Sequence, residues 1–220
     1  MRVVIGGGHG KIARILEGLL AERGDAAVGL IRNPAHAEDL RAIGAEPVVA
    51  DLEHSSVDDV AAHLTGADAV VFAAGAGPGS GIERKTTVDR DAAILLADAA
   101  EAAGVHRYLM ISAMGADRRA PEESADPVFA AYLRAKAEAD AAVLGRGALV
   151  ATIVRPGLLT DEPGTGRVRV AESTGRGSIP RADVAAILAA LLHAPRTGGL
   201  TFEVISGDTT IAEAIAVLSG

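Results

Sequence analysis

The sequence predicts an α/β fold, a doubly wound parallel sheet with a small C-terminal substrate lobe. Three observations support this prediction: short apolar runs alternate with helical patterns, a glycine-rich turn follows the first run, and no composition break divides the 220 residues. A chain of this length can bury one sizeable core without a second domain. We therefore expect a single domain over 1–220, in which about 157–220 contribute the small lobe.

The expected strands are the short, largely apolar runs. Runs of this kind are typical of parallel strands that helices cover on both faces. We expect strands at Arg2–Ile5, Ala26–Ile31, Glu46–Ala50, Ala69–Phe72, Arg107–Ile111, Leu149–Val154, Arg167–Val170 and Thr201–Ile205.

Helices are expected between these runs. Regular alternation of strand and helix indicates parallel strands joined by right-handed crossovers, which is the Rossmann-type arrangement. The helical stretches are Lys11–Arg23, Pro34–Ile43, Ser56–Leu64, Glu83–Ala103, Pro127–Leu144 and Arg181–Leu192, with a last helix from Thr210.

Several helix ends carry residues that favour a boundary. Asn33-Pro34 and Asp126-Pro127 each place a capping side chain before a proline, which is tolerated at the first helical position. Glycine is favoured just past a helix, where the chain adopts a left-handed conformation. We expect this role for Gly24, Gly44, Gly66 and Gly104.

Composition and charge exclude several classes of protein. The chain has no cysteine, so disulfides, thiolate nucleophiles and cysteine-ligated metals are ruled out. Its net charge of −8 argues against nucleic acid as a partner. No apolar run approaches the about 20 residues of a membrane span, and no signal-peptide pattern precedes Gly6. We expect a cytoplasmic protein with no membrane partner.

The segment VVIGGGHGKIAR raises the question of what its glycines do. Gly7-x-x-Gly10-x-x-Ala13 lies between the first expected strand and the first expected helix. In that position Gly7 allows a tight turn, Gly10 lets the backbone approach a diphosphate, and Ala13 keeps the helix close to the strand. A phosphate-binding loop of the Walker type is excluded, because Lys11 is followed by Ile12. The segment therefore predicts a dinucleotide site at a helix N-terminus.

The end of the second strand bears on the choice of dinucleotide. An acidic residue there would bind the ribose hydroxyls of NAD, but this chain has Arg32. A guanidinium suits a 2′-phosphate, so we expect NADP (NADPH) in preference to NAD. A solvated arginine is the alternative interpretation. Further contacts with the cofactor are expected at the ends of the third and fourth strands, from Asp51, Leu52, Ala73, Ala74 and Gly75.

A tyrosine and a lysine four residues apart form the candidate catalytic pair. Tyr132 and Lys136 share one face of the expected helix, in a chain that has two tyrosines. An ammonium stabilises a neighbouring phenolate, so Tyr132 can exchange a proton with a carbonyl or alcohol, and Lys136 can also hold the nicotinamide ribose. Ser112 ends the fifth strand and can hydrogen-bond the same oxygen. Plain packing of Tyr132 and backbone capping by Ser112 are the alternatives.

The histidines do not form a metal-binding pattern. His9 lies in the glycine turn and is a candidate cofactor contact, whereas the other five are scattered without ligand spacing. We therefore expect no metal site. A Gly-x-Ser-x-Gly motif is also absent, which argues against an α/β-hydrolase.

Together these motifs resemble the short-chain dehydrogenase/reductase superfamily, and more closely its atypical members, which include epimerase/dehydratase-like, NmrA-like and flavin/biliverdin-reductase-like proteins. The resemblance covers nearly the whole chain. The matching motifs are Gly7–Ala13, Ile31-Arg32-Asn33, Val88-Asp89, Ile111-Ser112-Ala113, Tyr132-x-x-x-Lys136, Val154-Arg155-Pro156-Gly157, Glu162–Gly166 and Ile179–Ala185.

The resemblance implies a site as well as a fold. The family's active-site set is Asn, Ser, Tyr and Lys; Asp89 stands in the position of the Asn, with Ser112, Tyr132 and Lys136 for the rest. The spacing from Ser112 to Tyr132 is longer than is usual in the family. The additional cofactor contacts that the resemblance implies are Lys11, Ile12, Asn33, Pro156, Gly157 and Leu158.

Three functions are compatible with these features. The first is an NADP-dependent oxidoreductase that transfers hydride to or from a small carbonyl, quinone or flavin-like substrate. The second is a non-enzymatic, NmrA-like sensor of NADP, and the third is a sugar epimerase or dehydratase, for which the C-terminal lobe is short. We expect a small-molecule substrate, chosen by 75–84, 115–125 and 161–180, and a monomer or homodimer.

Overall fold

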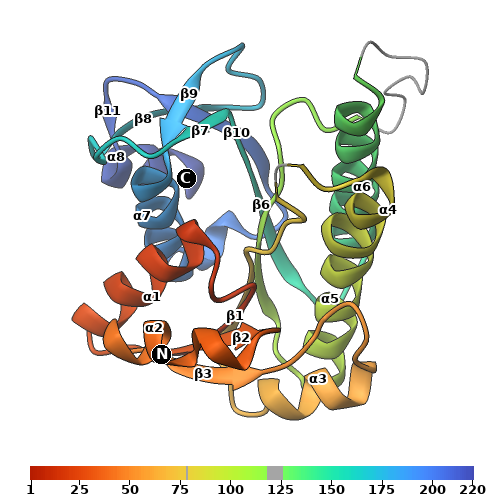
Figure 1. Ribbon diagram of the computed structural model, residues 1–220. Coiled ribbons are helices and arrows are strands. Elements are labelled where there is room, and N and C mark those ends of the chain that lie inside the picture. Colours follow the sequence, from red (N-terminus) through yellow and green to blue (C-terminus); the bar gives the residue numbers. More distant parts are fainter. Residues whose placement is uncertain (78, 118–125) are drawn as a thin grey trace.

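The computed structural model describes residues 1–77, 79–117 and 126–220 (Figure 1). In this part of the chain one large sheet runs through the molecule, with helices on both of its faces. From edge to edge its nine strands are β11 (Thr209–Thr210), β8 (Arg167–Ala171), β10 (Thr201–Ser206), β6 (Val150–Pro156), β5 (Arg107–Ile111), β4 (Ala69–Phe72), β1 (Arg2–Gly6), β2 (Ala26–Ile31) and β3 (Glu46–Val49).

Seven of these strands are parallel, from β10 to β3, and only β8 and β11 run antiparallel to their neighbours. The chain adds β2 and β3 on one side of β1, and then adds β4, β5 and β6 on the other side. The boundary between β1 and β4 is therefore the switch point of a doubly wound sheet. The predicted fold class is therefore confirmed. β7 (Leu158–Thr160) and β9 (Ser178–Pro180) form a separate parallel pair.

The helices cover the sheet in two groups, which Figure 1 shows on its two sides. One group consists of α1 (Lys11–Glu22), α2 (Ala37–Ala42), α7 (Arg181–Leu192) and α8 (Ile211–Leu218), and the other of α3 (Val57–Leu64), α5 (Ala92–Ala102) and α6 (Pro127–Leu144). None of the helices in the described residues is both long and apolar enough to cross a membrane.

Two separate hydrophobic cores result from this arrangement. Successive side chains of a strand point to opposite faces, so Val3 and Ile5 join the core under α1 and α7, and Val4 joins the core under α3 and α5. Tyr108 and Met110 of β5 likewise face the second core. This double burial explains why the strands are apolar at almost every position.

The predicted helix boundaries are largely confirmed. The Asn33 side chain accepts a hydrogen bond from Ala35 N (3.0 Å), at the start of the 3₁₀ turn Pro34–His36. Asp126 accepts one from Phe129 N (2.9 Å) at the start of α6. The four glycines expected at helix ends all have positive φ, namely Gly24, Gly44, Gly66 and Gly104.

The stretch predicted as one helix over Glu83–Ala103 differs from that prediction. It consists of the short helix α4 (Ile82–Arg84), a π-helical turn over Lys85–Asp91, and α5. A π turn widens the helix by one residue per turn and turns Lys85, Val88 and Asp89 inward, where they are buried. Apolar periodicity cannot distinguish such a turn from a regular helix.

The short strands β7, β9 and β11 are also absent from the prediction. Each has only two or three residues, too few to give a periodic signal. The C-terminal residues extend the large sheet through β10, β8 and β11, while α7 packs against α1.

Candidate functional site

Two cavities lie at the carboxyl ends of the parallel strands. The first has a volume of about 390 Å³ and is lined by the glycine turn and the ends of β2, β3 and β4. The second has about 460 Å³ and is lined by residues 73–77, Gly79, Ser80, the π turn, the end of β5 and the start of α6. Ala73, Ala74 and Gly75 line both cavities, so the two are neighbours across the end of β4.

The glycine turn borders the first cavity. Gly7 has φ +82°, and a Cβ there would lie 2.6 Å from the Cα of Ala74. Gly10 N donates to Gly7 O (2.8 Å), and Gly10 precedes α1 without any side chain capping the helix. The first N–H groups of α1 therefore lack a side-chain acceptor, and they lie beside a cavity that glycine keeps open. These features fit a dinucleotide diphosphate.

Gly8 has a different role, which involves a buried carboxyl group. A Cβ on Gly8 would lie 2.6 Å from Gly29 Cα and 2.9 Å from Glu17 Oε1, and a Cβ on Gly29 would lie 2.5 Å from that same oxygen. Glu17 is fully buried, and neither of its carboxyl oxygens has a hydrogen-bond partner among the described residues. Burial raises the pKa of Glu17 to about 8, so its carboxyl is largely protonated at neutral pH.

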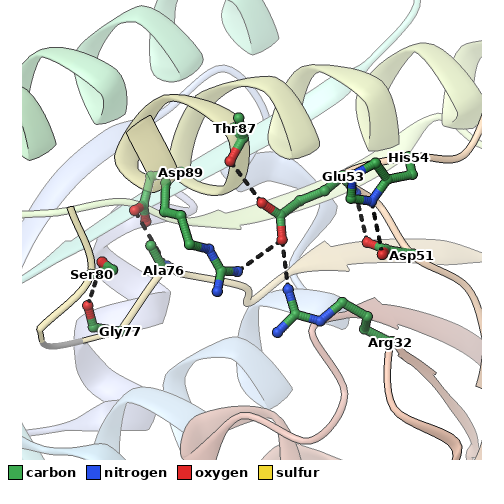
Figure 2. Close-up of polar contacts among 10 residues, drawn as sticks. Arg32, Asp51, Glu53, His54, Ala76, Gly77, Ser80, Thr87 and Asp89 are labelled. Atoms are coloured by element: carbon green, nitrogen blue, oxygen red, sulfur yellow. Dashed lines mark hydrogen bonds and ion pairs between the residues drawn. The ribbon is translucent and has the colours of Figure 1, made fainter. Parts of the chain in front are cut away.

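Arg32 does not lie free in the first cavity but pairs with a carboxylate. Its Nη1 lies 2.7 Å from Glu53 Oε2, and Arg84 Nη2 lies 2.8 Å from the same oxygen. Thr87 Oγ1 donates to the other oxygen of Glu53 (2.7 Å), as Figure 2 shows together with the Arg32 contact. The group carries one net positive charge, from two guanidiniums and one carboxylate.

Three more of the predicted cofactor residues also line the first cavity. Asn33, Asp51 and Leu52 lie on its wall. The Asp51 carboxylate accepts from Glu53 N (3.0 Å) and contacts His54 Nδ1 (3.0 Å), which fixes the turn after β3 (Figure 2). The carboxylate of Asp51 is therefore already engaged by its own turn.

Two histidines stack at the edge of the first cavity. His9 and His36 have ring centroids 3.6 Å apart and nearly parallel planes, and both line the cavity. His9 Nε2 also lies 2.7 Å from Asp39 Oδ2. The sequence singled out His9, whereas only the tertiary structure brings His36 beside it.

The second cavity contains all four predicted catalytic residues: Asp89, Ser112, Tyr132 and Lys136. Lys136 is 3% exposed; its Nζ donates to Ile111 O (3.2 Å) and lies 3.2 Å from Asp89 Oδ1. The same Nζ lies 5.9 Å from the centre of the Tyr132 ring. Lys136 therefore connects the end of β5, the π turn and Tyr132.

The hydroxyl of Tyr132 is held in its protonated form. Burial raises the pKa of Tyr132; Lys136 opposes this effect, and Asp89 and Asp140 reinforce it. The expected influence of Lys136 is present but smaller than that of burial. Tyr132 is thus set up to donate a proton rather than to exist as a phenolate.

Ser112 and a second lysine complete this cavity. The Ser112 hydroxyl is buried and makes no hydrogen bond of good geometry with the described residues, but it lies close enough to the Asp140 carboxyl to lower the pKa of that group. Lys85, which the sequence analysis did not single out, lies with its Nζ 5.3 Å from the centre of the Tyr132 ring and donates to Gly77 O (2.9 Å). The sequence could have indicated Lys85 because it precedes the candidate Asp89 by four residues, a spacing that places two residues on one face of a helix.

Four predicted cofactor residues do not line either cavity. Lys11 is largely exposed and pairs with Asp161 (2.5 Å). Gly157 N donates to Val204 O and Leu158 N donates to Gly177 O, both at 2.9 Å. These amide groups are therefore used in backbone hydrogen bonds. Pro156 O accepts from Met114 N (3.0 Å). From this segment Leu159 lines the second cavity, and the predicted Ile12 lines it as well.

Within 1–77, 79–117 and 126–220 no group of three or more histidine or acidic side chains lies together as metal ligands would. Of the segment 115–125, which we expect to help choose the substrate, residues 118–125 lie outside the described part of the chain.

A doubly wound sheet with an uncapped glycine turn at its first crossover defines a Rossmann-like, nucleotide-cofactor-binding protein. Comparison with known proteins identifies the group: residues 7–195 match the NAD(P)H-binding family, and the chain belongs to that family. This result confirms the resemblance to atypical short-chain dehydrogenase/reductases.

Individual relatives carry the names of two kinds of enzyme. An uncharacterized sugar epimerase of Bacillus subtilis, YhfK, is 38% identical over 99% of this chain and 100% of its own length. A Bacillus halodurans structure that carries the name of a NAD-dependent epimerase/dehydratase is 38% identical, covers 99% of both chains and has a TM-score of 0.90. The oxidoreductase ylbE of Lactococcus lactis is 26% identical, with a TM-score of 0.84 over 99% of this chain and 96% of its own.

Proposed function

We propose that the protein is an NADP-dependent oxidoreductase that reduces a small carbonyl, quinone or flavin-like substrate. The observation that carries this proposal is the junction of the two cavities: the glycine turn borders one, the Tyr132–Lys136 pair lies in the other, and Ala73, Ala74 and Gly75 line both. A dinucleotide laid across the end of β4 would bring its nicotinamide next to Tyr132.

The residues of the first cavity are suited to hold the cofactor. The N–H groups at the start of α1 would bind the diphosphate, and small side chains at Ala73 and Ala74 leave room beside it. Arg32 and Arg84 would bind the 2′-phosphate. Bound there, the cofactor supplies the hydride.

Preference for NADP depends on Glu53. Its carboxylate now accepts from both arginines, and a 2′-phosphate offers the same guanidiniums more negative charge and three oxygens. The phosphate would take over the guanidiniums from Glu53, which Thr87 can retain. With NAD, the cluster would stay closed and contribute no phosphate contact.

The residues of the second cavity are suited to move a proton. Tyr132 is protonated and would donate its proton to the substrate oxygen as the hydride reaches the neighbouring carbon. The buried Lys136 ammonium stabilises the phenolate that this leaves, and the Ser112 hydroxyl, which lines the same cavity, can donate a hydrogen bond to the same oxygen.

A sugar epimerase is the second candidate, because YhfK of Bacillus subtilis carries that name at 38% identity over nearly the whole of both chains. Such an enzyme would oxidise and re-reduce one substrate, so the bound cofactor would show no net turnover. An epimerase would leave added NADPH unconsumed but would interconvert nucleotide sugars.

The test begins with calorimetry of NADPH, NADP⁺ and NADH binding, followed by NADPH consumption over a panel of aldehydes, quinones and flavins. Tyr132→Phe should lower kcat on any reduced substrate by about 10²- to 10⁴-fold, as expected for loss of a general acid. The matched control is Tyr108→Phe, because Tyr108 is buried in β5 with its hydroxyl on Ala93 O (3.1 Å) and lines neither cavity. It should retain the wild-type kcat.

Three results would contradict the proposal. Failure of NADPH and NADP⁺ to bind at millimolar concentration would remove the cofactor site altogether. Binding without turnover of any compound in the panel would favour the sugar epimerase if nucleotide sugars are interconverted, and the NADP sensor if they are not. Equal activity of Tyr132→Phe and wild type would remove Tyr132 from the chemistry.

A further inference from the structure

The charged side chains of the second cavity are almost all matched with partners. Lys136 pairs with Asp89 (3.2 Å), and Arg181 pairs with Asp161 (2.6 Å). The remaining carboxylate that lines the cavity, Asp126, accepts a hydrogen bond from the backbone at the start of α6. Lys85 is the remaining charged side chain of this cavity, and its partner is the question.

The surroundings of Lys85 are short of negative charge. The residue is 9% exposed, and its Nζ donates to one backbone carbonyl, Gly77 O (2.9 Å). No carboxylate of the described residues forms an ion pair with it, since Asp89 one turn away is held by Lys136 and by Ala76 N. A buried ammonium with one neutral acceptor is costly, because it has lost water without gaining a counter-charge.

The position of Lys85 relates this charge to the reacting atoms. The π turn directs Lys85 and Asp89 into the same cavity, and the Lys85 Nζ lies on the Tyr132 ring, 5.3 Å from its centre. An anionic group bound to Lys85 would therefore belong to the molecule whose oxygen meets Tyr132. Only a few bonds would separate the anionic group from the substrate oxygen that meets Tyr132.

From these contacts we propose that the substrate is a carbonyl compound that carries a carboxylate, and that Lys85 binds this carboxylate as a specificity-determining residue. The inference deepens the proposed function and rests on it. In the reaction, the carbonyl carbon gains the hydride from NADPH and its oxygen gains the Tyr132 proton, which yields the alcohol and NADP⁺. The carboxylate is unchanged and keeps its ion pair with Lys85.

The test uses the NADP⁺-loaded protein, which cannot reduce a carbonyl, so that binding is measured without turnover. The probes are phenylglyoxylate and its neutral methyl ester, titrated by calorimetry against wild type, Lys85→Met, Lys85→Arg and Arg41→Met. Arg41 is an exposed residue of α2 outside both cavities, so Arg41→Met is the control for the loss of one positive charge.

Wild type and Arg41→Met should bind phenylglyoxylate at least about tenfold more tightly than the ester, as a charge-assisted hydrogen bond predicts. Lys85→Met should lose this preference and keep its affinity for the ester and for NADP⁺, while Lys85→Arg should restore part of it. A thermal melt of each NADP⁺-loaded variant separates loss of binding from loss of folding.

Several outcomes would overturn the inference. These are equal binding of both probes by wild type, binding of neither, or a preference for phenylglyoxylate that survives in Lys85→Met. A lower Tm in Lys85→Met with the preference intact would assign Lys85 to the support of the loop at Gly77 instead. Failure of wild type to bind NADP⁺ is a different result, because it overturns the proposed function itself.

Discussion

In the first cavity the ion pairs of Glu53 with Arg32 and Arg84 lie near the solvent, whereas in the second the Lys136–Asp89 pair lies in the interior. The side chains of Arg32 and Arg84 are 55% and 41% exposed, yet both contact Glu53. In the second cavity Lys136 and Asp89 are 3% and 1% exposed. Both cavities thus contain ion pairs, of 2.7 and 2.8 Å in the first and 3.2 Å in the second, in very different surroundings.

The difference in surroundings suggests different uses. An exposed ion pair contributes little to stability, so a ligand phosphate can separate Arg32 from Glu53 with a small loss of free energy. A buried pair cannot lose one partner without leaving a charge that water no longer solvates. We therefore expect the first cavity to adapt to its ligand and the second to hold a fixed arrangement around Tyr132.

The largest expected effect comes from breaking the buried pair. Asp89→Ala leaves the Lys136 ammonium without its carboxylate and should lower the free energy of unfolding by about 3 to 5 kcal/mol. Urea denaturation of the purified variant measures this change. Asp89→Asn, which keeps an oxygen for Ala76 N, should cost less. A change below about 1 kcal/mol in Asp89→Ala would show that the pair is not held in the interior.

The next largest effect concerns Glu17, which lies beneath the glycine turn of the first cavity. Its pKa is raised to about 8 in the folded protein, so the folded state keeps a proton that the unfolded state releases above about pH 4.5. The stability that this proton provides is complete below that pH and is lost as pH rises towards 8. Between pH 5 and 7.5 the wild type should lose roughly 3 kcal/mol relative to Glu17→Gln.

Unfolding curves of the two proteins at several pH values make this comparison. Glu17→Gln keeps the size of the side chain and cannot ionise, so its stability should not show the decline. Parallel pH profiles would show that the Glu17 carboxyl is solvated in the folded protein.

A third prediction concerns the exposed cluster of the first cavity. Arg32→Ala should weaken NADPH binding by about 10- to 100-fold, the effect of one charge-assisted hydrogen bond, and leave NADH binding nearly unchanged. Glu53→Gln should strengthen NADPH binding, since the phosphate would no longer compete with a carboxylate. Equal weakening of NADPH and NADH by Arg32→Ala would contradict a 2′-phosphate contact.

The smallest effect is expected for a surface pair outside both cavities. On α2, Arg41 Nη1 lies 2.5 Å from Glu38 Oε1, and both side chains are exposed. Glu38→Gln should change the free energy of unfolding by about 0.5 kcal/mol or less, as measured for exposed helix pairs. Comparison of Glu38→Gln with Asp89→Ala shows how much of the stability lost in Asp89→Ala comes from burial of the charges rather than from pairing alone. Comparable losses in both variants would contradict the contrast between the two cavities.

The fold was largely predictable from the sequence. Doubly buried strands must be apolar throughout, and the predicted bounds agree with β2, β4 and β5 at both ends and stop one residue short of the end of β1. The glycine turn was predictable because φ +82° and a 2.6 Å approach at Gly7 leave no room for any other residue. Tyr132 and Lys136 were predictable as a pair because their contact is local to one helix.

What only the tertiary structure decided are the contacts between segments far apart in the chain. Glu53 meets Arg84 and Thr87 across more than thirty residues, and Lys136 meets Asp89 from another helix. The net pKa of Tyr132 depends on burial that no local pattern reveals. Local sequence determines backbone conformation and which residues are apolar, but the surroundings of a charge depend on which distant segments pack around it.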